Sequence, residues 1–129
     1  MLEKDLIKRF MTELKKIEPH CFYFKSHGEP LQVRGIPDIL LCFRGLFVGA
    51  EFKIIRKTKM NVTPYQEYNL ELIYKAHGFP VIIWYQDKPE KYGVLKQSFP
   101  VLEEAVRYFA DICIQIKCGN NKVLEKEKM

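Results

Sequence analysis

The sequence predicts an α/β fold in which one mixed β-sheet is covered by helices. Three observations predict it: an amphipathic segment at the start of the chain, two adjacent apolar runs joined by Arg44-Gly45, and a buried apolar run at 80–85 that follows a second helical segment. Strands that alternate with helical segments are typical of layered α/β structures. The 129 residues fit one domain, which we place at 1–118, with a charged tail at 119–129.

The first segment, residues 2–17, has the spacing of a helix with one buried face. Its apolar residues follow the i, i+3, i+4, i+7 pattern: Leu6, Ile7, Phe10, Met11, Leu14 and Ile17. Residues 21–26 are rich in aromatic side chains and suit a strand. The runs at 37–43 and 46–54 predict a β-hairpin, because Gly45 can supply the positive φ of a two-residue turn.

The rest of the chain predicts a helix, two strands and a last helix. Thr63 can cap a helix that begins at Pro64, and we expect Gly78 to end that helix after His77. Residues 80–85 form a continuous apolar run, which is typical of a buried strand. Residues 92–96 suit an edge strand, and residues 100–116 suit a helix.

Composition favours a polyanionic partner and argues against a membrane protein. The chain has 21 basic and 16 acidic residues and a net charge of +5, which favours nucleic acid only weakly. No apolar run approaches the roughly 20 residues that span a bilayer. The four cysteines form no C-x-x-C pair, so we expect no zinc site and a reduced, cytoplasmic setting.

Two carboxylates stand on strands that are otherwise apolar. Asp38 lies at the start of the first hairpin strand, and Glu51 lies inside the second, two residues before Lys53. If Arg44-Gly45 is the turn, opposed residues have numbers that sum to 89, so Asp38 and Glu51 face each other with Cβ atoms about 4.5–5.5 Å apart. Like charges so placed repel unless a divalent cation bridges them. Lys53 shares the face of Glu51, because side chains alternate along a strand.

Magnesium fits this predicted site. It prefers oxygen ligands and keeps several waters, so one or two carboxylates and a substrate phosphate suffice. A bound metal lowers the pKa of a water and stabilises charge in an in-line displacement at phosphorus. Lys53 would orient the water, deprotonate it or offset transition-state charge, and the sequence leaves these three roles open.

These motifs together resemble the PD-(D/E)XK nuclease superfamily and, within it, the stand-alone VRR-NUC nucleases. The matching frame, within residues 3–85, is 25–28, 34–38, 45–48, 51–53 and 63–66. Phe52 departs from the family, in which a smaller aliphatic residue is usual. The resemblance implies a restriction-endonuclease-like core and a Mg²⁺-dependent DNA endonuclease, with Mn²⁺ as an alternative, in a bacterial or phage-infected cell. It also implies a homodimer that acts on branched DNA, similar to the Holliday-junction resolvases of DNA repair.

The resemblance implies roles for individual residues. The expected catalytic residues are Asp38, Glu51, Lys53 and Gln66. The expected metal-binding residues are Glu3, Asp38, Glu51 and Phe52. The expected DNA contacts are Lys25, Arg34, Arg56, Lys57 and Lys59.

Several of these roles have structural alternatives. Glu3 competes with Glu13 as the helix carboxylate, and it also suits the first turn of a helix for purely electrostatic reasons. Gln66 can instead complete a capping box with Thr63, and a basic run is often only a solvated loop. Three rival functions stay open: a non-catalytic DNA-binding module, an exonuclease or restriction-like endonuclease, and an interaction subunit whose acids form a structural metal or salt-bridge site.

Overall fold

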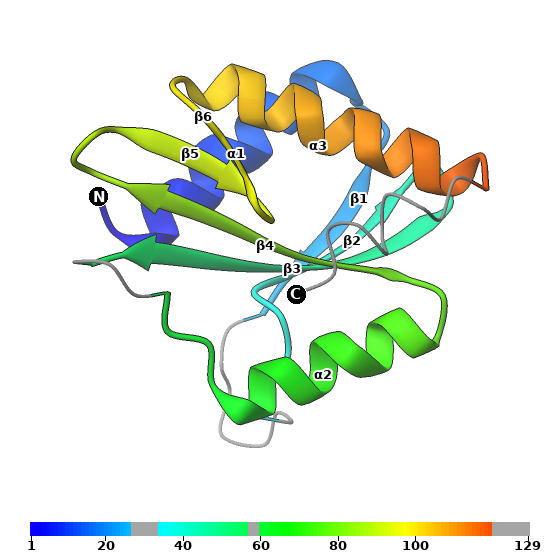
Figure 1. The fold of residues 1–129 in the computed structure, drawn as a ribbon. Helices are drawn as coiled ribbons and strands as arrows, with labels where there is room; N and C mark the ends of the chain where they lie inside the picture. Colours follow the sequence, from blue (N-terminus) through cyan, green and yellow to red (C-terminus); the bar gives the residue numbers. More distant parts are fainter. Residues whose placement is uncertain (27–33, 57–59, 120–129) are drawn as a thin grey trace.

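The structure is a computed structural model that describes residues 1–26, 34–56 and 60–119. Within these ranges a six-stranded sheet is flanked by three helices, as Figure 1 shows. In chain order the elements are α1 (Glu3–Ile17), β1 (Phe22–Lys25), β2 (Ile39–Phe43), β3 (Leu46–Ile55), α2 (Pro64–Lys75), β4 (Phe79–Gln86), β5 (Lys91–Val94), β6 (Gln97–Phe99) and α3 (Leu102–Lys117). The strands lie in the sheet in this same order.

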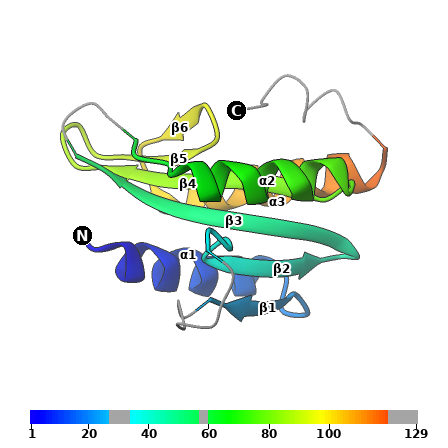
Figure 2. The same ribbon diagram turned by 90° about the horizontal axis from the view of Figure 1, so that it is seen from below.

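The sheet is mixed and has helices on both faces. Strands β3 and β4 run parallel, and the other neighbouring pairs run antiparallel. Helices α1 and α3 cover one face and α2 covers the other (Figures 1 and 2). The α/β class with a central mixed sheet flanked by helices is therefore confirmed.

The main core lies between α1, α3 and the sheet. The ring of Phe10 on α1 meets Phe52 on β3 and Phe109 on α3 edge to face, with ring centroids 5.6 and 5.4 Å apart. A smaller cluster of Leu70, Ile82 and Trp84 lies under α2. Edge-to-face rings contribute beyond their buried area, so this core holds β3 firmly against two helices.

The hairpin has the predicted register. Its paired residues run from Phe43↔Leu46 to Ile39↔Ala50, and in each pair the residue numbers sum to 89. Arg44 and Gly45 both have positive φ, 50° and 87°, as a type I′ turn requires. Asp38 is the residue before the paired part of β2, so the register places it opposite Glu51.

Two expectations were wrong, one about the residue that ends α2 and one about which strand forms the edge of the sheet. His77, with φ of 68°, takes the left-handed position that ends α2, and the Gly78 N–H donates to the Ile73 carbonyl at 2.8 Å. This is the Schellman arrangement moved one residue toward the N-terminus. Residues 91–94 also do not form the edge of the sheet, because β6 pairs outside them.

The structure also shows whether a helix could cross a membrane and whether the cysteines are free thiols. None of the helices in the described residues is long and apolar enough to cross a membrane. All four cysteines are free thiols: Cys21 and Cys113 are buried, whereas Cys42 and Cys118 are exposed. Of the residues at 119–129, the structure describes only Gly119.

Candidate active site

Alternation along β3 separates the core residues from the charged ones. Ala50 and Phe52 face the core under α1 and α3, so Glu51 and Lys53 point to the opposite face, toward α2. Glu51 is 2% exposed and Lys53 is 9% exposed, and they are the buried charged residues of the described chain. Burying an ionised group is costly unless it is paired or binds a metal, so this placement needs a compensating partner.

Asp38 is held at the end of β2 by two backbone hydrogen bonds. The Phe52 N–H donates to Asp38 Oδ2 at 2.8 Å, and the Ser26 N–H donates to the Asp38 carbonyl at 2.8 Å. The first bond aims the carboxylate at β3. The second joins the end of β1 to the same point, so three strands fix the position of Asp38.

The loop before Asp38 packs directly on the start of α2. Gly35 has φ of 79°, and a Cβ at this position would overlap the backbone of Tyr65 and Gln66. Only glycine allows both this φ and this approach. The Asn69 amide donates to the Arg34 carbonyl at 2.8 Å, which ties the same loop to α2. Gly35 thereby sets the distance between α2 and the carboxylate strands.

Gln66 connects α2 to both charged residues of β3. Its Oε1 accepts from Lys53 Nζ at 2.9 Å and from the Thr63 N–H at 3.0 Å, while its Nε2 donates to Glu51 Oε1 at 3.2 Å. The Gln66 N–H donates to Thr63 Oγ1 at 3.2 Å, which completes the capping box. Gln66 therefore caps α2 and also contacts both Glu51 and Lys53.

The second carboxyl oxygen of Glu51 is buried next to Asp38. Among the described residues, no N–H or hydroxyl group donates to Glu51 Oε2, so its one hydrogen-bond partner is the neighbouring Asp38 carboxyl group, through a shared proton. Burial raises the pKa of Glu51, and a hydrogen bond and charge repulsion from Asp38 raise it further, whereas the charge of Lys53 lowers it. Two carboxyl groups can share a hydrogen bond only through a proton. When both groups are ionised, the two carboxylates repel each other, and a bound cation would offset that repulsion.

These features fit a divalent cation bound between Asp38 and Glu51. Both offer oxygen donors, which Mg²⁺ prefers, and a Mg²⁺ site needs few protein ligands because the ion keeps several waters. No group of three or more Asp, Glu, His or Cys side chains in the described residues is arranged to hold a metal. A metal at this site would therefore be held by the carboxylate pair together with water or substrate.

Glu3 lies beside this pair at the first turn of α1. Partial burial raises the pKa of Glu3, the charge of Asp38 raises it further, and the charges of Lys53 and Arg56 lower it. Glu13 instead forms an ion pair with Lys16 at 2.8 Å. Of the two rival helix carboxylates, Glu3 is the one near the site, although it does not complete a three-residue metal cluster.

Phe52 cannot bind a metal through its side chain. Its ring is fully buried against Phe10 in the main core, and an aromatic ring offers no oxygen ligand. Its backbone N–H is already engaged by Asp38. The carbonyl oxygen of Phe52 is thus the one atom of this residue that could serve a metal.

The predicted DNA-contact residues lie in different places. Lys25 is exposed on β1 and pairs with Ile39, a core residue under α1, so its side chain lies on the face opposite Glu51 and Lys53. The Arg34 guanidinium lies 5.6 Å from the centre of the Tyr65 ring on the α2 side. Arg56 is exposed directly after β3. Lys57 and Lys59 lie outside the described residues.

Sequence reasoning missed Asn69, which positions the site from α2. Its amide donates to the carbonyls of Arg34 and Tyr65 at 2.8 and 2.9 Å. A lone asparagine on a helix gives no signal in a sequence, because its partner lies 35 positions away in the chain.

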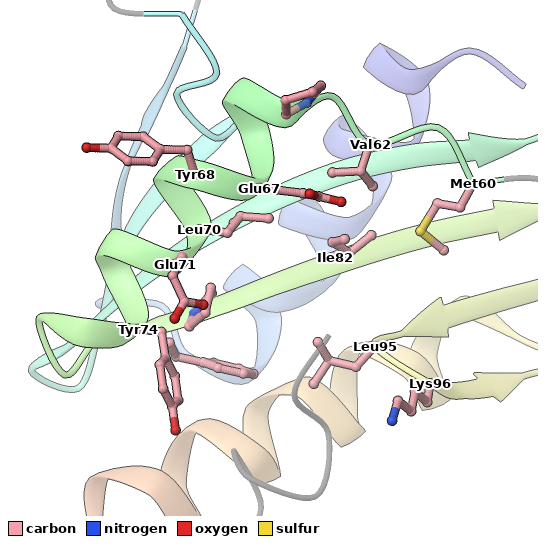
Figure 3. A pocket seen from close by; sticks show the side chains of 13 residues that line it. Met60, Val62, Glu67, Tyr68, Leu70, Glu71, Tyr74, Ile82, Leu95 and Lys96 are labelled. Atoms are coloured by element: carbon pink, nitrogen blue, oxygen red, sulfur yellow. The ribbon is translucent and has the colours of Figure 1, made fainter.

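A separate apolar pocket lies on the other side of α2. It has a volume of about 710 Å³ and is lined by side chains from α2, β4 and the β5–β6 turn, including Leu70, Ile82 and Leu95 (Figure 3). Its carboxylates are Glu67 and Glu71, and none of Asp38, Glu51 and Lys53 lines it. The pocket is therefore distinct from the carboxylate site.

Comparison with known proteins adds no assignment. A scan against protein-family models found no matching family, and a search of curated proteins found no match.

Proposed function

We propose that this chain is a Mg²⁺-dependent deoxyribonuclease that hydrolyses phosphodiester bonds at the site formed by Asp38, Glu51, Lys53 and Gln66. The single observation that carries the proposal is the burial of Glu51 opposite a second carboxylate and on the same face as a buried lysine, with no N–H or hydroxyl donor to its Oε2 among the described residues. A purely structural carboxylate at this position would be expected to have a donor for each buried oxygen.

A resident divalent cation would supply a water of lowered pKa and stabilise charge on the phosphate. Asp38 and Glu51 would hold it, since their carboxylates converge from neighbouring strands. The Lys53 ammonium has three N–H donors, and one of them donates to Gln66 Oε1 at 2.9 Å, which fixes the position of the group. An ammonium held next to a bound phosphate would offset the negative charge that develops on the phosphate in the transition state.

Gln66 acts as a positioning residue in this proposal. It holds Glu51 and Lys53 through separate atoms of one amide, so neither side chain can turn away independently. Because the same amide caps α2, the helix start and the two β3 side chains form one rigid unit. Fixing reacting groups in this way contributes to catalysis through orientation.

The preferred substrate in this proposal is branched DNA, and the active form is a homodimer. A two-fold pair of identical chains would present two sites to two strands of a junction. This part of the proposal rests on the resemblance to stand-alone VRR-NUC nucleases.

The experiment compares wild type with Asp38→Asn on labelled four-way-junction, flap, duplex and single-stranded DNA, each with Mg²⁺, Mn²⁺ or EDTA. Asparagine keeps an acceptor for the Phe52 N–H, so the variant is expected to fold. We expect metal-dependent cutting by wild type, strongest on the junction, and loss of cutting in the variant. Binding without cutting on every substrate would refute the nuclease and favour a non-catalytic DNA-binding module.

A further inference from the structure

A groove lined by lysines is formed by side chains of α1, β1 and β2. Figure 2 shows α1 next to β1, the edge strand of the sheet, on the face opposite α2. The charged lining residues of the groove are Lys4, Lys8, Lys15, Lys25 and Asp5. Four ammonium groups against one carboxylate make the groove strongly positive compared with the chain as a whole, which has 21 basic and 16 acidic residues.

The spacing of the lysines makes a continuous track. Lys4, Lys8 and Lys15 stand at i, i+4 and i+11 of α1, so they lie close to one stripe of the helix. Eleven residues of helix span about 16 Å. Lys25 enters the same groove from β1.

Three of the four ammonium groups are available to a ligand. Lys4, Lys8 and Lys25 are exposed, and their ammonium groups form no ion pair or hydrogen bond with any residue that the structure describes. Lys15 is different, because its Nζ donates to the Cys21 carbonyl at 2.8 Å and lies 5.6 Å from the centre of the Tyr23 ring. Lys15 is thereby fixed as part of the groove wall.

The lone carboxylate of the groove is already engaged. Asp5 Oδ2 accepts from the Leu2 N–H at 3.2 Å, a bond that caps the start of α1. Within the part of the chain that the structure describes, Asp5 forms no ion pair with a lysine.

One end of the groove adjoins the carboxylate site. Lys25 is followed by Ser26, whose N–H donates to the Asp38 carbonyl at 2.8 Å. At the same end, Lys4 follows Glu3, the α1 carboxylate beside Asp38. The charges of Asp38 and Lys53 also act on Glu3, so this end of the groove lies near the carboxylate site, although Glu51 and Lys53 point to the opposite face of the sheet.

We infer that the groove between α1 and β1 binds the phosphate backbone of the DNA strand that enters the site. The inference rests on the proposed function for its substrate, and it adds Lys4 and Lys8 to the DNA-binding residues. Lysine contacts to phosphate neutralise charge and release counterions, so they make binding salt-dependent without reading sequence.

The test measures DNA binding without cleavage. Wild type, a groove variant (Lys4→Gln, Lys8→Gln, Lys25→Gln) and a control variant (Lys75→Gln, Lys88→Gln, Lys117→Gln) are titrated against a short fluorescein-labelled duplex in EDTA at several salt concentrations. Both variants lose three positive charges, and the three control lysines are exposed residues outside the groove. Each lysine that contacts phosphate contributes about 0.9 to the slope of log K against log salt, so the groove variant should lose about 2.7.

The inference is supported if the slope of log K against log salt becomes less steep in the groove variant and not in the control variant. An equal loss in both variants would overturn it, because net charge alone would then explain binding. An unchanged slope in the groove variant would overturn it as well. Cleavage by wild type, measured separately with Mg²⁺, tells the two proposals apart: cutting with an unchanged groove slope refutes only the groove, and groove-dependent binding without cutting refutes only the nuclease.

Discussion

Replacing Glu51 by glutamine is predicted to stabilise the metal-free protein at neutral and alkaline pH. Burial, with Asp38 adding to it, raises the pKa of Glu51 from 4.5 to about 9. Between these two pH values the unfolded chain has released a proton that the folded chain keeps. Stability therefore falls as pH rises from about 4.5 to about 9, and a neutral glutamine removes this loss.

The size of the effect follows from the pKa difference. At pH 7 the distance from the unfolded pKa is about 2.5 units, and each unit corresponds to about 1.36 kcal/mol, which gives an upper bound of about 3 kcal/mol. Glutamine retains an acceptor for Gln66 Nε2, so we expect about 2 kcal/mol of this to be realised. For a chain of 129 residues, 1 kcal/mol shifts the Tm by about 4 °C, so the Tm should rise by about 8 °C.

The assay is thermal unfolding in EDTA at a series of pH values, followed by circular dichroism. The gap between Glu51→Gln and wild type should be absent near pH 4.5 and widen toward pH 9. Glu104→Gln, an exposed change in the first turn of α3, is the control and should stay within about 0.5 kcal/mol of wild type. A variant that is no more stable than wild type at any pH would refute the reasoning. Added Mg²⁺ should then stabilise wild type alone and narrow the gap.

Three further substitutions test the site and the loop that positions it. Lys53→Met keeps the apolar stem and removes the ammonium, so Mg²⁺ should still raise the Tm while single-turnover cleavage falls by about 100-fold or more; retained cleavage would exclude Lys53 from the chemistry. Gln66→Ala removes a cap and two site hydrogen bonds and should lower the free energy of unfolding, measured in urea, by about 1–3 kcal/mol. A much smaller decrease would show that the Gln66 amide does not stabilise the start of α2 or the two β3 side chains. Gly35→Ala should cost more than about 1 kcal/mol, and Gly119→Ala, which shares the positive φ but has open space around it, should cost clearly less; equal losses would contradict the close packing of Gly35 on Tyr65.

The carboxylate pair could be predicted from the sequence because a two-residue turn determines the register of a hairpin. Once Arg44 and Gly45 occupy the turn, the positions of Asp38 and Glu51 follow by counting. The face shared by Glu51 and Lys53 follows from alternation alone. Both relations depend only on residues close together in the sequence, so they can be predicted without knowing how distant segments pack.

The remaining features depend on packing between distant segments. The face of Lys25 requires the register between β1 and β2, which no tight turn determines. The double role of Gln66 requires the close approach of α2 to β3, which depends on Gly35. Strand β6 has three residues with no buried side chain, so it leaves no periodic signal. The lysine track was readable in part, since Lys4 and Lys8 are spaced as helix neighbours, but its other wall comes from β1.

Cleavage of labelled junction DNA by Glu51→Gln in Mg²⁺ tests the carboxylate site most directly. This variant is expected to be more stable than wild type, so unfolding could not explain a loss of activity. We predict that wild type and Glu104→Gln cut the DNA, and that Glu51→Gln binds it without cutting. Cutting by Glu51→Gln at the wild-type rate would contradict the assignment of this buried carboxylate to the active site.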